Sequence, residues 1–285
     1  MIIEKIVPVN SGTYVKWKEY FIHIGEKIDS LGLIQLFTIW TLTVSGIVTS
    51  MDFQNRYVYW EWNGWMIGLF KLIVASFLFL GYLHPKKLWL IGTKTLSVRE
   101  IILHLMISSL LFIFGYLDFT FFQSEKYSLL KELYLSNVIF SLSYYMMAFF
   151  SCLIVFQFTL VLDKEKGVWN NYEWENKPLY FSLSIISMFI SIMVSISYED
   201  PVASTASAVA IPYSIIALIW PNHVRHLQRA RFYPIFTFAM FFCVLAPWFI
   251  IPLALLFFFI RTVNYFRFGI VYPSFGVDFL EEENV

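Results

Sequence analysis

The sequence predicts an all-α, polytopic integral membrane protein with about seven transmembrane helices in one bundle and a cytoplasmic N-terminus. Composition is the first reason, because 59% of the 285 residues are hydrophobic and only 14% are charged. A soluble domain carries about 25% charged residues, so this chain has too little polar surface to face water on all sides. The other two reasons are long apolar runs and the concentration of lysine and arginine in alternate loops.

Seven segments are long and apolar enough to be predicted spans, since a helix crosses the hydrocarbon with about 20 apolar residues. They are Leu31–Ser50, Trp65–Leu83, Ile101–Phe122, Ile139–Leu162, Leu179–Ser197, Val202–Trp220 and Ile235–Ile260. Residues 1–30 have no long apolar run and are expected to form an interfacial amphipathic segment. Residues 31–260 then make the transmembrane bundle, and residues 261–285 an aromatic C-terminal tail.

The basic residues indicate which loops face the cytoplasm. With the N-terminus inside, 14 of the 20 lysines and arginines fall in inside segments, five fall in outside segments and Lys71 lies within a span. Cytoplasmic loops of membrane proteins carry such an excess of basic residues. The split therefore predicts an inside N-terminus, and we place the protein in a bacterial inner membrane.

The last predicted span has an alternative. Ile235–Ile260 contains Pro247 and Pro252, which should kink the helix because proline lacks the backbone N–H of the helical ladder. A broken or re-entrant segment here would bring the C-terminal tail inside. The lysines and arginines would then divide into 16 inside and three outside.

Small residues predict a close contact between the fifth and sixth spans. Ser184, Ser187, Ser191 and Ser195 are three or four positions apart, which places their hydroxyls on one helical face. The sixth span begins with a run of alanine and serine. Small residues let helices approach closely in lipid, so we predict a tight hairpin; a hydroxyl-lined substrate path is the functional alternative.

Two charged residues fall inside predicted spans. Lys71 and Asp118 lie on consecutive helices at similar depth from the outer face, which makes an intramembrane ion pair the functional hypothesis. The alternative is that Lys71 reaches out to the head groups and Asp118 meets water. The spans carry no further carboxylates at greater depth, which argues against an ion-coupled transporter.

The stretch "WPNHVRHLQRARFYP" between the last two spans holds three arginines and two histidines on the inside. Guanidinium groups bind phosphate through two parallel hydrogen bonds, whereas lysine acts as a point charge. The stretch therefore predicts a binding site for a phosphate-type lipid head group; the alternative is a basic loop that only orients the helices. The residues predicted to form the site are His223, Arg225, His226, Arg229 and Arg231.

The five histidines lie near the inside ends of the predicted spans. A metal or haem site would need several imidazoles to converge from different helices. His223 and His226 form one pair, and His104 or His84 would have to supply a third ligand. We predict no metal site, because isolated histidines at a membrane interface are ordinary, and no motif identifies a cofactor.

Three functions fit these observations. The first is a protein that binds or modifies an anionic lipid or an isoprenoid with a phosphate-type head group at the cytoplasmic face. The second is a non-catalytic subunit or assembly factor with other membrane subunits as partners, and the third is a transporter. A net charge of zero argues against a nucleic-acid partner. No residue pattern identifies a reaction or shows that the protein is an enzyme.

Overall fold

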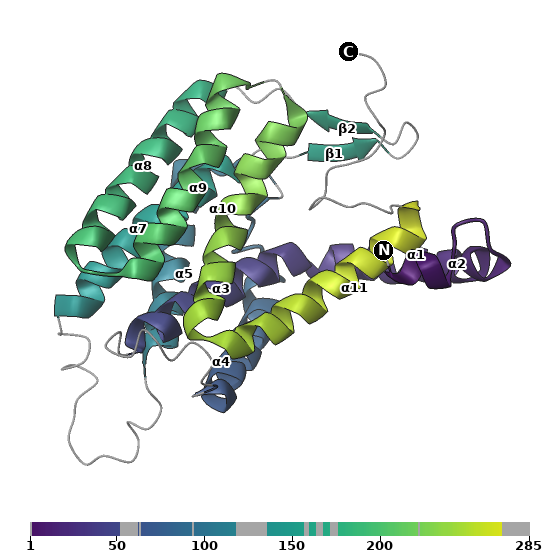
Figure 1. Ribbon diagram of the computed structural model, residues 1–285, viewed down its shortest axis with the longest axis horizontal. Coiled ribbons are helices and arrows are strands. Elements are labelled where there is room, and N and C mark those ends of the chain that lie inside the picture. Colours follow the sequence, from purple (N-terminus) through teal and green to yellow (C-terminus); the bar gives the residue numbers. More distant parts are fainter. Residues whose placement is uncertain are drawn as a thin grey trace.

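The all-α, polytopic bundle is confirmed by the computed structural model (Figure 1). The structure describes residues 2–51, 62, 64–92, 94–117, 136–156, 160–163, 168–171, 176–221 and 223–269. Its helices are α1 (Ile2–Ile6), α2 (Gly12–Leu31), α3 (Leu33–Ser50), α4 (Trp65–Leu78), α5 (Val98–Tyr116), α7 (Ser136–Val155), α8 (Lys177–Ser197), α9 (Pro201–Ile219), α10 (Val224–Leu245) and α11 (Ile250–Phe268). A π-helical turn, Phe79–Leu83, extends α4.

Seven helical segments within the described residues are long and apolar enough to cross a membrane. Six of them overlap the first six predicted spans, and the end predicted for the third span, Phe122, lies outside the described residues. The fourth is shorter than predicted, because α7 ends at Val155 and Leu160–Asp163 forms the strand β1. That strand pairs antiparallel with β2 (Val168–Asn171) to make a small hairpin in the inside loop before α8.

The predicted span Ile235–Ile260 is broken into two helices, as the alternative reading required. α10 ends at Leu245, a 3₁₀ turn covers Pro247–Phe249, and α11 begins at Ile250. The hydropathy of the sequence is uniform across this break, so apolar length alone could not locate it. The seventh apolar segment is therefore Pro247–Phe268, and α10 is a further long helix of the bundle.

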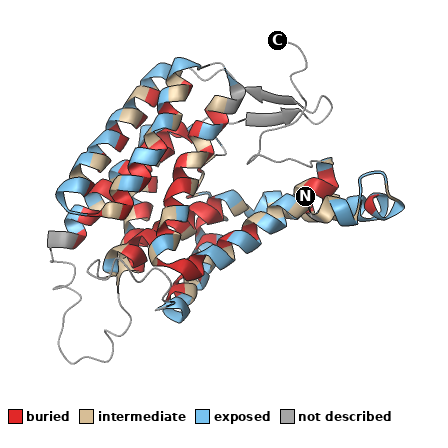
Figure 2. Ribbon diagram, viewed as in Figure 1, coloured by how far each residue is buried: buried red, intermediate tan, exposed pale blue. Residues whose placement is uncertain are grey.

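Helix α3 is the centre of the bundle. In its membrane span 72% of the residues are buried, against 28 to 61% in the other six candidate spans. Figure 2 shows the buried residues along the helices. Glycines let α5 lie directly against it, since a Cβ added to Gly46 would collide with the Phe112 carbonyl oxygen, and one on Gly115 with that of Thr43. Such close backbone approach compensates for the absence of a hydrophobic driving force between helices in lipid.

The predicted hairpin of α8 and α9 forms, and its serines also contact α7. The Ser184 hydroxyl lies 2.7 Å from that of Ser151 on α7 and 2.9 Å from that of Ser214 on α9. The Ser191 hydroxyl donates to the Tyr144 carbonyl oxygen and lies 3.2 Å from the Ser207 hydroxyl. These hydroxyls are used in helix–helix contacts, which supports the packing interpretation of the serine stripe.

The end of α11 lies beside the N-terminal segment (Figure 1). Phe266 stacks on Phe21 of α2 with ring centres 4.5 Å apart, and Arg267 forms an ion pair with Asp29 at 2.9 Å. The Arg267 side chain fits there because Gly25 has no Cβ. Both ends of the described chain thus lie at one end of the bundle, called the inside end because the basic residues predict that it faces the cytoplasm.

Candidate functional site

Three of the basic residues predicted to bind a lipid head group lie at or near the turn that joins α9 to α10. His223 immediately precedes α10. Its ring lies 4.3 Å from that of His226, which in turn lies 5.6 Å from the Trp220 ring at the end of α9. Arg229 follows about one turn along α10 and is exposed. The structure therefore brings these three basic side chains together at the inside end of the bundle.

Arg231 lies apart from this group. Its Nη2 donates a hydrogen bond to the Gly92 carbonyl oxygen at 2.9 Å, and its guanidinium carbon lies 5.0 Å from the centre of the Phe156 ring. Arg229 and Arg231 are two positions apart, so they project about 200° apart around the helix. Arg231 holds α10 to the inside loop, while Arg229 faces outward. The side chain of Arg225 lies outside the described side chains.

The positive charge of the exposed group comes mainly from arginine at neutral pH. The pKa of His226 is lowered first by partial burial and then by the neighbouring His223 and Arg229. Loss of hydration and nearby positive charge both disfavour the imidazolium form. His226 is therefore a neutral hydrogen-bonding group beside the cationic Arg229.

An open groove of about 370 Å³ runs between α9 and α10 on the outer surface of the bundle. At the end of the groove nearest the α9–α10 turn, the rings of Tyr213 and Tyr233 meet edge to face with centres 5.1 Å apart. One threonine hydroxyl and two phenols are the only polar side-chain groups in an otherwise apolar wall. The groove is lined by Val209, Tyr213, Tyr233, Phe236, Thr237, Met240 and Phe241.

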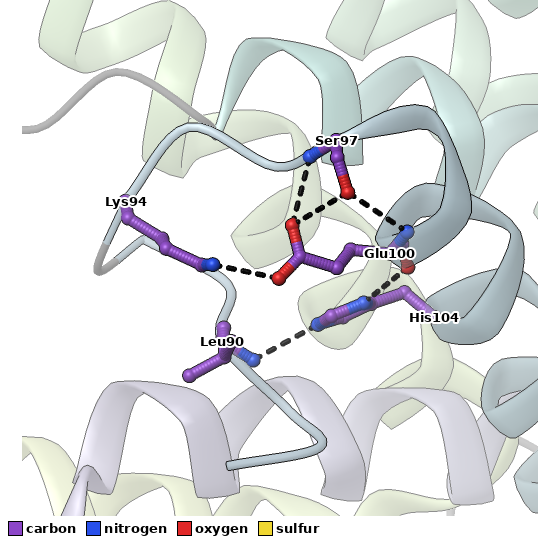
Figure 3. Close-up of polar contacts among 5 residues, drawn as sticks. All are labelled: Leu90, Lys94, Ser97, Glu100 and His104. Atoms are coloured by element: carbon purple, nitrogen blue, oxygen red, sulfur yellow. Dashed lines mark hydrogen bonds and ion pairs between the residues drawn. The ribbon is translucent and has the colours of Figure 1, made fainter.

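A hydrogen-bonded network fixes the inside loop that receives Arg231 (Figure 3). His104 Nε2 accepts a hydrogen bond from the Leu90 N–H at 2.9 Å, and His104 Nδ1 lies 2.6 Å from the Glu100 carbonyl oxygen. Glu100 also forms an ion pair with Lys94 and a capping box with Ser97 at the start of α5. Sequence reasoning missed this network, although a serine three residues before a glutamate is a recognised signal for a helix start.

The histidines do not converge on a metal in the described part of the chain, where no group of three His, Cys, Asp or Glu is close enough to hold one. His104 has both ring nitrogens in contact with backbone groups and stacks on Trp89. His84 Nε2 lies 2.6 Å from the Ser30 carbonyl oxygen. Each therefore has a local structural role, away from the pair formed by His223 and His226.

Lys71 is only 3% exposed, so it does not extend to the outer head groups. Its ammonium donates hydrogen bonds to the Gly115 and Leu117 carbonyl oxygens, each at 2.5 Å, at the end of α5. Terminal carbonyls of a helix attract cations, so Lys71 caps this helix. The ion-pair partner predicted for it, Asp118, lies outside the described residues.

No family model, curated protein or solved structure matches this chain. Its own side chains define what the inside end can do. The exposed Arg229 guanidinium and the imidazoles of His223 and His226 can donate hydrogen bonds to an anion, and the apolar groove further along the same two helices can accept hydrocarbon.

Proposed function

We propose that this multi-pass membrane protein binds the phosphate-type head group of a lipid or isoprenoid at the cytoplasmic face, through His223, His226 and Arg229. The observation that supports this most directly is the grouping of these three side chains next to Trp220 at the inside end of the bundle. Charge-assisted hydrogen bonds from arginine to phosphate are about twice as strong as those between neutral groups.

The different surroundings of the two arginines also support head-group binding. The Arg231 guanidinium is hydrogen-bonded within the fold, whereas the Arg229 side chain is exposed next to the His223–His226 pair. A loop that only orients helices needs positive charge but no particular arrangement of side chains. Here Arg229 lies on the same helix as the wall of an apolar groove, about one helical turn before its first lining residue, Tyr233.

The test compares lipids that differ only in the head group. We expect native mass spectrometry of the purified protein to show preferential retention of dioleoyl phosphatidic acid over dioleoyl phosphatidylcholine. Arg229→Gln should reduce the affinity for phosphatidic acid about tenfold or more, because one charge-assisted hydrogen-bonding group contributes about 1.5–3 kcal/mol.

Arg99→Gln is the matched control, because Arg99 is an exposed arginine in the first turn of α5 at the same end of the bundle. It removes the same charge, so a general attraction of the inner surface for anions would be weakened equally by both variants. Equal effects of the two substitutions, or no preference for phosphatidic acid in the unmodified protein, would refute the proposed site.

A further inference from the structure

The groove and the basic group lie on one continuous face of the α9–α10 pair. On α10, Arg229, Tyr233, Phe236 and Met240 are separated by four, three and four positions, which is the spacing of residues along one side of a helix. The last three of these line the groove. The cation is therefore placed at the inside end of the same stripe that forms the groove wall.

Helix α9 contributes a matching stripe. Val209 and Tyr213 line the groove, and Trp220 continues the same side seven residues further on, where its ring meets His226. The Tyr213–Tyr233 contact joins the two stripes midway. From Val209 to Trp220 the surface thus changes from apolar with one threonine hydroxyl, through two phenols, to imidazole and guanidinium.

We infer that this groove holds the hydrocarbon chain of a single anionic lipid whose phosphate lies against His226 and Arg229, an inference that rests on the proposed function. Its polarity gradient matches that of a membrane lipid, with an apolar chain toward the bilayer centre and an anionic head at the inside surface. The wall offers the chain van der Waals contacts with aliphatic and aromatic side chains, which are small individually and appreciable together.

The size of the groove favours a chain over a partner helix. An α-helix has a diameter of about 10–12 Å and a pitch of 5.4 Å, so a single turn occupies about 500 Å³. The groove holds about 370 Å³, which lies within the range of about 300–1,000 Å³ for sites that bind small molecules. A flexible chain can follow such a groove along its length, whereas a helix could place only side chains in it.

The test fills the groove without touching the basic group. Val209 lines the groove and is 44% exposed, and Ile215 is 38% exposed on a different side of α9, about 120° around the helix from Val209. We expect Val209→Trp to weaken binding of dioleoyl phosphatidic acid about tenfold, because the indole occupies the space of a chain segment and removes its van der Waals contacts. Ile215→Trp, which makes a similar change outside the groove, should leave the affinity unchanged.

A measurement on the unmodified protein covers the case in which Val209→Trp does not fold. Phosphatidic acid carrying a photoreactive diazirine near the end of one chain should cross-link to peptides that contain Val209, Met240 or Phe241. Cross-links spread evenly over the lipid-facing helices would overturn the inference, as would equal affinities of Val209→Trp and Ile215→Trp.

The two proposals fail in different ways. Retained preference for phosphatidic acid, still reduced by Arg229→Gln but unaffected by Val209→Trp, would refute the chain site and leave the head-group site standing. Equal retention of phosphatidic acid and phosphatidylcholine by the unmodified protein would refute the head-group site. A change in oligomeric mass on Val209→Trp, with lipid retention unaltered, would identify the groove as a protein contact and overturn the chain assignment.

Discussion

The guanidinium of Arg231 donates a hydrogen bond to the Gly92 carbonyl oxygen at 2.9 Å and so ties the start of α10 to the loop between α4 and α5. The same guanidinium lies over the Phe156 ring at the end of α7. One side chain therefore connects three parts of the inside surface. Its neighbour Arg229, two positions earlier, is exposed.

This difference predicts that two similar substitutions change the stability of the protein by different amounts. Arg231→Gln should lower the free energy of unfolding by about 2–3 kcal/mol, because it removes a charged hydrogen bond and a cation–π contact. Arg229→Gln should change stability by less than about 0.5 kcal/mol, as is usual at exposed positions. Thermal unfolding in detergent measures both; a similar loss of stability in the two variants would contradict the assigned roles.

His104 should be important for the conformation of the inside loop. His104→Leu leaves the half-buried Leu90 N–H without its acceptor, which costs about 1 kcal/mol, the lower end of the range for a buried group. We therefore expect a lower unfolding temperature and faster proteolysis between Lys86 and Ser97. His23→Leu is the control, because the His23 side chain is 81% exposed. Unchanged proteolysis of the loop in His104→Leu would show that the histidine does not hold it.

The crossing of α3 and α5 should not accept a methyl group. Gly46→Ala places a Cβ against the backbone of α5, where neither chain can move aside easily. We expect a destabilisation of about 1–3 kcal/mol, the usual cost of overpacking. Gly81→Ala is the matched control, because no atom lies within 4 Å of a Cβ added at that position. Equal thermal stability of the two variants would show that the helices do not cross this closely.

Six of the seven spans followed from apolar length, because this property depends on residue type alone. The inside location of the N-terminal segment stays a prediction from the basic residues. The break after Leu245 did not, since Pro247 and Pro252 lie in an apolar run that a kinked helix or two helices could equally form. Which of the two was formed depends on the packing of α11 against α2, and this involves residues more than 200 positions apart, such as Phe21 and Phe266.

The candidate site was only partly visible in the sequence. Residue type identified the basic stretch, and helical periodicity could also have separated Arg229 from Arg231, since they project to opposite sides. The groove could not be predicted in this way, because its wall exists only when Tyr213 of α9 meets Tyr233 of α10. The same holds for Gly92, whose carbonyl oxygen is selected as the partner of Arg231 by the path of a loop.

The position of the C-terminal end of α11 gives a last prediction, on topology. Phe268 ends α11 close to α2, so it should lie in the cytoplasm with Lys18, whereas Tyr198 lies in the turn between α8 and α9 at the opposite end. In a variant without native cysteines, Tyr198→Cys should react with a membrane-impermeant maleimide in intact cells. Lys18→Cys and Phe268→Cys should react only after permeabilisation, because hydrocarbon excludes the reagent and the basic inside loops keep these ends in the cytoplasm. Labelling of Phe268→Cys in intact cells, with Lys18→Cys still protected, would mean that α10 does not cross and that the basic group at its start is not held as described.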